Sequence, residues 1–179
     1  MKQTDTNRLP FLETRRLVLR PPAEGDFETW AELLADAEVT RYIGGTQPRS
    51  VAWRTMAMHS GSWNLRGCGL FSVIERASGR CIGRVGPWFP EGWPKPEMGW
   101  SLVRSAWGQG FATEAASAAL AWTFAALGWE EVVHYIEPGN GASIAVAERI
   151  GSSLLGETAL PPPVASDTTF LVYGQARSD

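Results

Sequence analysis

The sequence between residues 100 and 115 has residue types that could bind a phosphate group. A predicted strand ends here, a loop with Gly108 and Gly110 follows, and a helix is expected from Phe111. A helix N-terminus carries unpaired backbone N–H groups and the positive end of the helix dipole, and both favour a phosphate. Glycines without Cβ let the backbone approach such a ligand closely.

The spacing alone leaves two interpretations of this loop open. A strand, a glycine-containing loop and a helix are as typical of a tight turn as of a phosphate cradle. No Gly-Lys-Ser/Thr sequence occurs, so the loop is not a nucleotide-binding P-loop. The three-glycine fingerprint of dinucleotide-binding folds is also absent from it.

Hydrophobic patterns and turn residues predict the elements that position this loop. The order is a strand, two helices, a run of strands, a helix, a strand, a helix and two closing strands, which indicates an α/β (α+β) domain with a crossover helix. Asp26 and Ser50 are predicted helix N-caps. The predicted strands are 17–20, 70–75, 81–86, 96–103, 131–137, 154–155 and 170–173, and the predicted helices are 26–34, 50–64, 111–127 and 142–150.

Length and composition predict one domain over residues 1–179, with residues 1–10 as a loose N-terminal arm. A net charge of −3 argues against a nucleic-acid partner. We find no signal peptide and no membrane-spanning run, so we expect a cytoplasmic protein without a membrane partner. Cys68 and Cys81 form no metal-ligand pattern, so no metal is expected.

Four segments together resemble one known family. They are Glu-Thr-Arg-Arg-Leu-Val-Leu-Arg at 13–20, the passage 36–42, the segment 97–115, and Asn-Gly-Ala-Ser-Ile-Ala-Val-Ala-Glu-Arg-Ile-Gly at 140–151. This pattern is similar to the GNAT superfamily of N-acetyltransferases. Within it, the pattern is most similar to the subgroup that includes the ribosomal-protein N-terminal (alanine/serine) acetyltransferases.

The resemblance implies a fold and a co-substrate. The fold is a single domain with a mixed central sheet of six to seven strands and about four flanking helices. The sheet splays apart between two parallel strands, here expected at 97–103 and 131–137. Acetyl-CoA enters that gap as co-substrate.

The resemblance also implies which residues bind acetyl-CoA. Backbone groups of Leu102 and Val103 would bond the pantetheine arm. Many relatives have Gln or Arg three positions before the first loop glycine, where this chain has Ser105. The pyrophosphate would lie on the amides of Gly108, Gln109, Gly110, Phe111 and Ala112 with the Thr113 hydroxyl; Asn140 and Ser143 would face the pantetheine and thiol, and Arg149 the nucleotide end.

Acetyl transfer needs a neutral amine, and most amines are protonated at pH 7, so a general base is useful. Several family members carry a catalytic Glu at the position of Glu97, although this residue also fits a surface carboxylate at a strand start. Many relatives protonate the departing thiolate with a Tyr, but that position is Ala147 here. We expect the hydroxyl of Ser143 to replace that Tyr. The alternative is that this hydroxyl only bonds a backbone N–H in the first turn of its helix. A strand N–H near Val103 would hold the oxyanion.

The acceptor is less well specified by the sequence. Trp88, Trp93 and Trp100 could form an acceptor pocket, or they could belong to the core. The subgroup suggests a protein or peptide N-terminus. A small amine, such as an antibiotic, a polyamine or an amino-acid derivative, is the alternative acceptor. A catalytically degenerate acetyl-CoA-binding module is the rival function, and exposed apolar strands near the C-terminus leave a homodimer open.

Overall fold

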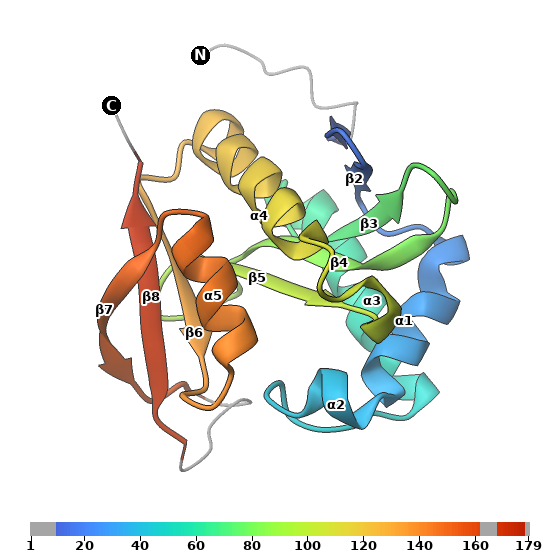
Figure 1. Ribbon diagram of the computed structural model, residues 1–179. Helices are drawn as coiled ribbons and strands as arrows, with labels where there is room; N and C mark the ends of the chain where they lie inside the picture. The colour runs from blue at the N-terminus through green and yellow to red at the C-terminus, as the bar shows by residue number, and fades with distance from the viewer. Residues whose placement is uncertain (1–9, 162–167, 178–179) are drawn as a thin grey trace.

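One mixed β-sheet runs through residues 10–161 and 168–177, the part of the chain that the computed structural model describes (Figure 1). Residues 1–9, most of the predicted arm, lie outside the described residues. The strand order is β1-β2-β3-β4-β5-β6-β8-β7, and every neighbouring pair is antiparallel except β5 and β6. The strands are β1 (Leu12–Glu13), β2 (Leu17–Arg20), β3 (Phe71–Glu75), β4 (Cys81–Trp88), β5 (Glu97–Leu102), β6 (Glu131–Ile136), β7 (Ser153–Thr158) and β8 (Phe170–Ala176).

Helices cover both faces of this sheet. None of the helices in the described residues is long and apolar enough to cross a membrane. Short 3-10 turns, η1 (Glu24–Asp26) and η2 (Arg104–Ala106), precede α1 and α4. The α-helices are α1 (Phe27–Ala35), α2 (Ala37–Thr40), α3 (Arg49–Arg66), α4 (Phe111–Trp122) and α5 (Gly141–Arg149).

The predicted α/β (α+β) class is confirmed, with a mixed sheet that opens between two parallel strands. The sheet has eight strands in the described residues rather than six or seven, because Leu12–Glu13 adds a two-residue strand beside β2. Five α-helices rather than four are present there, because α2 is a single turn. Its N-cap is Asp36, whose carboxylate accepts from the amides of Glu38 and Val39. Elements this short leave no hydrophobic period in the sequence.

Three predicted helix boundaries differ from the structure. The carboxylate of Asp26 does not cap α1 but bonds the Ala23 amide and the Arg20 guanidinium. The third helix begins one residue before Ser50, after Pro48, whose extended backbone ends the preceding loop. The predicted helix 111–127 is α-helical only to Trp122 and continues as a π-helix over Thr123–Leu127.

Each face of the sheet has its own helices. Figure 1 shows α4 and α5 in front of the sheet and α3 behind it. Fully buried alanines of α4, at positions 115, 116 and 119, pack in the core with Leu17, Leu19, Phe71 and Val85. On the opposite face, Trp30 of α1 donates its indole N–H to Ser72 of β3 at 3.1 Å. We call these two sides the α4–α5 face and the α1–α3 face.

Candidate functional site

The loop between β5 and α4 presents a row of free backbone donors. Gly108 and Gly110 both have left-handed backbone, with φ of 71° and 76°, which glycine adopts without strain. The amides of residues 108–113 have no hydrogen-bond acceptor within the described residues; the first bonded amide is that of Glu114, which donates to the Gly110 carbonyl. This row includes the predicted donors Gln109, Phe111 and Ala112. Six consecutive free amides at a helix start form a ready anion site.

A contact from the N-terminal strands holds this loop in place. The Glu114 carboxylate accepts from the Thr14 hydroxyl at 2.6 Å, from the Arg16 amide at 2.9 Å and from the Arg16 Nε at 2.7 Å. Arg16 also donates to the Gln109 carbonyl at 2.9 Å and lies 4.4 Å from the centre of the Phe111 ring. Glu114 therefore joins the β1–β2 turn to the start of α4.

The sheet splits immediately beyond the start of β5. The parallel register between β5 and β6 consists of one pair, Glu97 with Val133, whereas β4 and β5 share six consecutive pairs. Beyond it, the imidazole Nδ1 of His134 bonds the Met98 carbonyl at 2.7 Å. The His134 side chain takes the place of the next backbone hydrogen bond between β5 and β6. The two strands therefore diverge from this point onward.

Hydrogen-bond alternation along β5 decides which backbone groups face the split. Val103 donates its amide to the Ile82 carbonyl at 3.0 Å, on the β4 side. Alternate residues point to opposite sides, so the amides of Trp100 and Leu102 face the split. The Leu102 carbonyl already accepts from the Trp107 indole at 2.8 Å. We therefore move the pantetheine and oxyanion contacts expected from the Val103 amide to those of Trp100 and Leu102.

Asn140 and Ser143 lie where β6 passes into α5. Asn140 is the N-cap of α5, and its side-chain oxygen accepts from the Ser143 amide at 3.1 Å. The Ser143 hydroxyl has no partner within the described residues, so it is free to serve a ligand. Arg149 is exposed in the last turn of α5, at the opposite end of the helix from Asn140. The Thr113 hydroxyl, in the first turn of α4, is also without a partner in the described chain.

Glu97 lies at the one paired position of β5 and β6, where the split begins. The Trp93 indole donates to its carboxylate at 2.8 Å. Burial raises the pKa of Glu97 to about 7, although the Trp93 bond opposes this change. Tyr135 lies beside the pair, its ring centre 6.0 Å from that of Trp93. Burial, followed by the charge of Glu97, raises the pKa of Tyr135 to about 12, so its hydroxyl stays protonated. A carboxyl group with a pKa near 7 can exchange protons with an amine at neutral pH.

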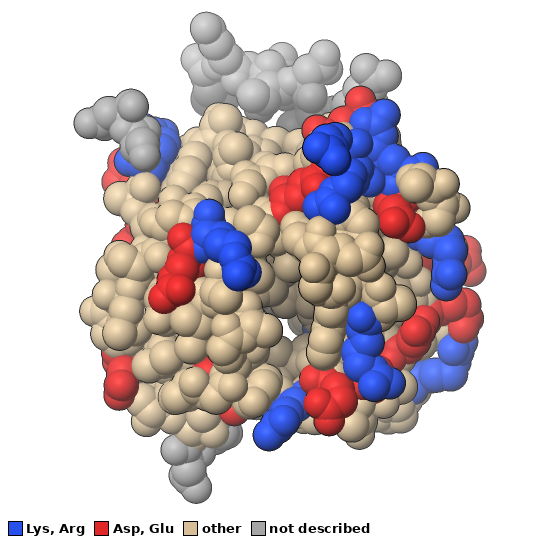
Figure 2. Space-filling model, viewed as in Figure 1, with Lys and Arg blue, Asp and Glu red and all other residues tan. Residues whose placement is uncertain are grey.

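The overall arrangement is a split sheet with a loop of free amides on one side of it and a carboxyl group with a raised pKa on the other. Figure 2 shows a hollow between the region of α5 and the loop that follows β5. Its surroundings near α5 carry few charged side chains, whereas charged side chains are frequent on the right half of this view. A family model described as an acetyltransferase (GNAT) domain matches residues 16–153.

The chain belongs to the GNAT acetyltransferases.

Relatives and solved structures agree with this assignment. The chain is 32% identical over 148 residues to the uncharacterised protein YkkB of Bacillus subtilis, covering 78% of this chain and 83% of that protein. It is 31% identical over 136 residues to the uncharacterised N-acetyltransferase p20 of Bacillus licheniformis, covering 74% and 76%. An acetyltransferase from Agrobacterium tumefaciens has a TM-score of 0.82 at 32% identity, covering 99% of this chain and 100% of that one.

The predicted family is confirmed, and with it acetyl-CoA as co-substrate. The ribosomal-protein-S5-alanine acetyltransferase from Vibrio fischeri has a TM-score of 0.73 at 16% identity, covering 95% of this chain and 98% of that one. At this identity the likeness shows a shared fold alone. The predicted ribosomal-protein subgroup is thus among the structural neighbours of this acetyltransferase.

In this acetyltransferase, the position where many relatives carry a Tyr lies in a packed cluster. Ala147 is fully buried and packs with Ile136, Tyr173 and Trp100. A tyrosine side chain would have no room there without displacing its neighbours. Tyr173, from β8, is buried in the same cluster. The replacement of that Tyr by the Ser143 hydroxyl stays a prediction.

The three tryptophans predicted for the acceptor pocket do not lie together. Trp88 is directly opposite Glu97 in the β4–β5 pairing, and Trp93 donates to the Glu97 carboxylate. Trp100 points to the α4–α5 face, where its ring centre lies 4.8 Å from that of His134. Trp88 and Trp93 thus surround the carboxyl group, and Trp100 packs beneath the split.

His134 is a functional candidate that the sequence analysis did not single out. Burial lowers the pKa of His134 to about 4, so the ring is neutral. A carbonyl only accepts, so Nδ1 carries the proton to Met98, and Nε2 accepts from the Ser152 hydroxyl at 2.9 Å. Gln175 donates to the same hydroxyl at 2.9 Å. This chain of bonds from β8 to β5 fixes where the strands separate.

Proposed function

We propose that this acetyltransferase moves the acetyl group of acetyl-CoA to a primary amine by direct attack in a ternary complex. The supporting observation is the Glu97 carboxyl group, which has a pKa near 7 and lies at the opening of the sheet. The free amides at the start of α4 would bind the pyrophosphate on the other side of that opening. The degenerate binding-module alternative has no use for a carboxyl group tuned in this way.

In the proposed reaction the amine nitrogen attacks the thioester carbon. Glu97 accepts the amine proton, directly or through a water. The amide of Trp100 or Leu102 stabilises the negative charge that develops on the thioester carbonyl oxygen. The C–S bond then breaks, and the Ser143 hydroxyl donates a hydrogen bond to the departing CoA sulfur. The products are the acetylated amine and CoA.

We propose a protein or peptide N-terminus as the acceptor, following the subgroup with which the chain shares its fold. The alternative is a small amine, and the half-buried Trp88 and Trp93 beside Glu97 would suit either acceptor. We also propose a cytoplasmic location, where acetyl-CoA is available.

The first test measures CoA thiol release with peptides of varied N-termini, aminoglycosides and polyamines. We expect release with one amine class, and a loss of kcat of about 100-fold in Glu97→Gln with unchanged acetyl-CoA binding. Ser143→Ala should lose less, because positioning of the amine and thioester remains. If acetyl-CoA binds and no amine releases thiol, the binding-module alternative is favoured. Equal rates in wild type and both variants would refute the assigned roles.

A further inference from the structure

Three buried polar side-chain atoms lack a hydrogen-bond partner among the described residues: His59 Nδ1, Arg84 Nε and Ser101 Oγ. All belong to the α1–α3 face. Arg84 of β4 and Ser101 of β5 are directly opposite each other in the sheet. His59 of α3 packs on Trp88 of β4, with 4.4 Å between ring centres. Buried polar atoms in native proteins are nearly always bonded, so this gathering points to an absent ligand.

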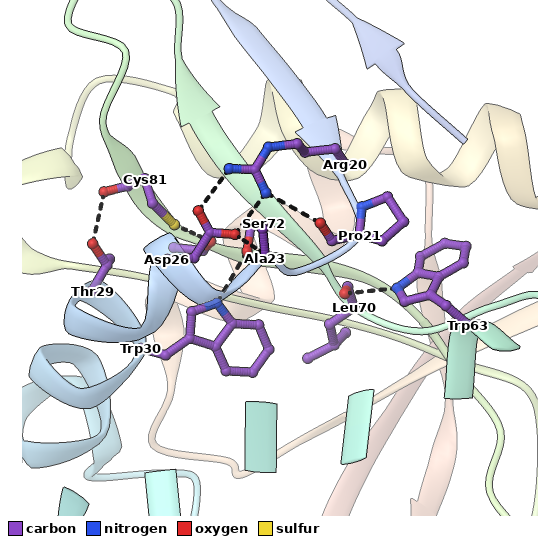
Figure 3. A network of polar contacts seen from close by, with 11 residues as sticks. Arg20, Pro21, Ala23, Asp26, Thr29, Trp30, Trp63, Leu70, Ser72 and Cys81 are labelled. Carbon is purple, nitrogen blue, oxygen red and sulfur yellow. Dashed lines mark hydrogen bonds and ion pairs between the residues drawn. The ribbon is translucent and has the colours of Figure 1, made fainter. Parts of the chain in front are cut away.

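Arg20 shows how the same face satisfies a guanidinium when the protein supplies a carboxylate. The register places Arg20, Ser72 and Arg84 in one row across β2, β3 and β4. Two nitrogens of Arg20 donate to Asp26, each at 2.7 Å, as Figure 3 shows. The Arg84 guanidinium makes no ion pair and no hydrogen bond within residues 10–161 and 168–177. It has the position of a paired arginine and lacks the carboxylate.

The surroundings of Arg84 leave its charge uncompensated. The guanidinium lies 5.1 Å from the centre of the Trp30 ring. This is its one cation–π contact in the described structure. Burial, followed by the charge of Arg84, lowers the pKa of His59 well below its usual range, so this neighbour is neutral. Burial lowers the pKa of Arg84 only to about 10, so it stays protonated at neutral pH. The Nε of this partly buried cation is itself buried without an acceptor, which is unfavourable until an anion pairs with it.

On this face of β5, only Gly99 lies between Ser101 and the proposed general base. Glu97, Gly99 and Ser101 point to the same face of β5, because the register with β4 is unbroken along this stretch. A Cβ built on Gly99 would meet no heavy atom within 4 Å. Glu97 and Ser101 are roughly 13 Å apart along the strand, and Gly99 lies midway. The acetyl-CoA phosphates belong to the loop before α4, on the other face, and do not account for Arg84.

We propose that Arg84 and Ser101 bind a carboxylate of the acceptor, so that the enzyme acetylates amines carrying an anionic group several bonds from the nitrogen. This inference rests on the proposed function and names its substrate class. Arg84 would hold the carboxylate through its fork of N–H groups, as Arg20 holds Asp26. The amine would then lie near Gly99, about 7 Å away along the strand and midway between Ser101 and Glu97.

The test compares ω-amino carboxylates of three to eight carbons with their carboxamides as acceptors. We expect kcat/KM for the best acid to exceed that of its amide by at least about tenfold. Arg84→Gln should reduce this ratio to near one, whereas Arg84→Lys should keep part of it. Arg54→Gln is the matched control, because Arg54 is exposed on α3 and forms no ion pair in the described chain. An unchanged ratio in folded Arg84→Gln would overturn the proposal.

A second set of acceptors identifies the source of the carboxylate. Short peptides with Glu or Gln at the second position present the same pair of groups on a peptide. A preference for Glu that disappears in Arg84→Gln assigns the carboxylate to a peptide side chain. A preference confined to the ω-amino acids assigns it to a small molecule. No acid preference in either set would refute the carboxylate site.

Failure of this site and failure of the proposed function give different results. Calorimetric titration with acetyl-CoA should give the same Kd in wild type, Arg84→Gln and Arg84→Lys. Thiol release without any acid preference overturns the Arg84 proposal alone. If acetyl-CoA binds but no amine releases thiol, the proposed function fails. Titration with 6-aminohexanoate then decides the site: binding to wild type but not Arg84→Gln supports it, and binding to neither refutes it.

Discussion

The protonation state of Glu97 should set the pH dependence of the reaction. With a pKa of about 7, this carboxyl group becomes a base as the pH rises through neutrality. We expect kcat/KM to rise between pH 6 and 8 and then level off for an acceptor whose own amine pKa lies below 6. In Glu97→Gln the rate should fall about 100-fold at pH 8, and this rise should vanish. Thiol release between pH 5.5 and 9 measures this pH dependence in the wild type and in the variant. A rise near pH 7 that persists in the variant would assign it to another group.

At the level of single residues, the sequence could locate candidates but not their partners. Glu97 and Asn140 were found because they match positions of the segments that resemble the GNAT superfamily. The Trp93 bond that accompanies Glu97, and the unpaired charge of Arg84, depend on which strands lie side by side. Local patterns contain no information on that pairing, so Trp93 was predicted without its bond to Glu97, and Arg84 was not singled out.

At the level of elements, Glu114 connects two segments that are distant in sequence. Its carboxylate accepts three hydrogen bonds from Thr14 and Arg16, two of them from charged or backbone nitrogen donors. Glu114→Ala should lower the free energy of unfolding by about 2 kcal/mol. It should also raise KM for acetyl-CoA, because Arg16 no longer holds the Gln109 carbonyl in place.

Urea unfolding and steady-state kinetics test this prediction. Glu28→Ala is the matched control: Glu28 pairs with Arg49, and both side chains are more than half exposed, so its loss should leave the free energy of unfolding almost unchanged. Equal effects of the two substitutions would show that Glu114 is an ordinary surface carboxylate, as its place at a helix start suggests from the sequence.

The pairing of β4 with β5 depends on one glycine. Gly83 has φ of 154°, and a Cβ there would lie 2.4 Å from the Ser101 carbonyl oxygen and 2.7 Å from the Leu102 Cα. Gly83→Ala must displace β5 at the residue whose amide faces the split. We expect a loss of about 1–3 kcal/mol of stability and weaker acetyl-CoA binding. Gly25→Ala, with no atom within 4 Å of its Cβ, should do neither. Thermal unfolding and calorimetry with both variants check this.

The order of the main elements could be predicted because strands and helices of five or more residues carry a hydrophobic period and clear end signals, such as Gly67 in left-handed backbone after α3. The π-helix at the end of α4 could not be predicted from a run of helix-forming residues. The Thr123 hydroxyl, buried and bonded to the Ala119 carbonyl at 2.7 Å, marks where the backbone changes.

At the level of the whole molecule, the site combines two buried titratable groups that respond to pH in opposite directions. Glu97 has a pKa raised to about 7 in the folded state, so the folded protein binds its proton more tightly than the unfolded chain. Its contribution to stability is therefore lost as pH rises from about 4.5 to 7. His134 has a pKa lowered to about 4, so its contribution is lost as pH falls from about 6.5 to 4.

Each group contributes up to about 3 kcal/mol over its pH window, so in the wild type the two pH-dependent contributions largely cancel between pH 4.5 and 6.5.

Single variants should reveal these two contributions. Glu97→Gln should be more stable than wild type at pH 8 and should lose stability more steeply on acidification. His134→Asn keeps a donor for the Met98 carbonyl but cannot titrate, so the effect of Glu97 is left alone and stability should rise as the pH falls from about 7 to 4.5. His59, buried and neutral, is unchanged in both variants. Urea unfolding at pH 4.5, 5.5, 6.5 and 7.5 measures these slopes, and three parallel curves would show that neither buried group couples protonation to the split sheet.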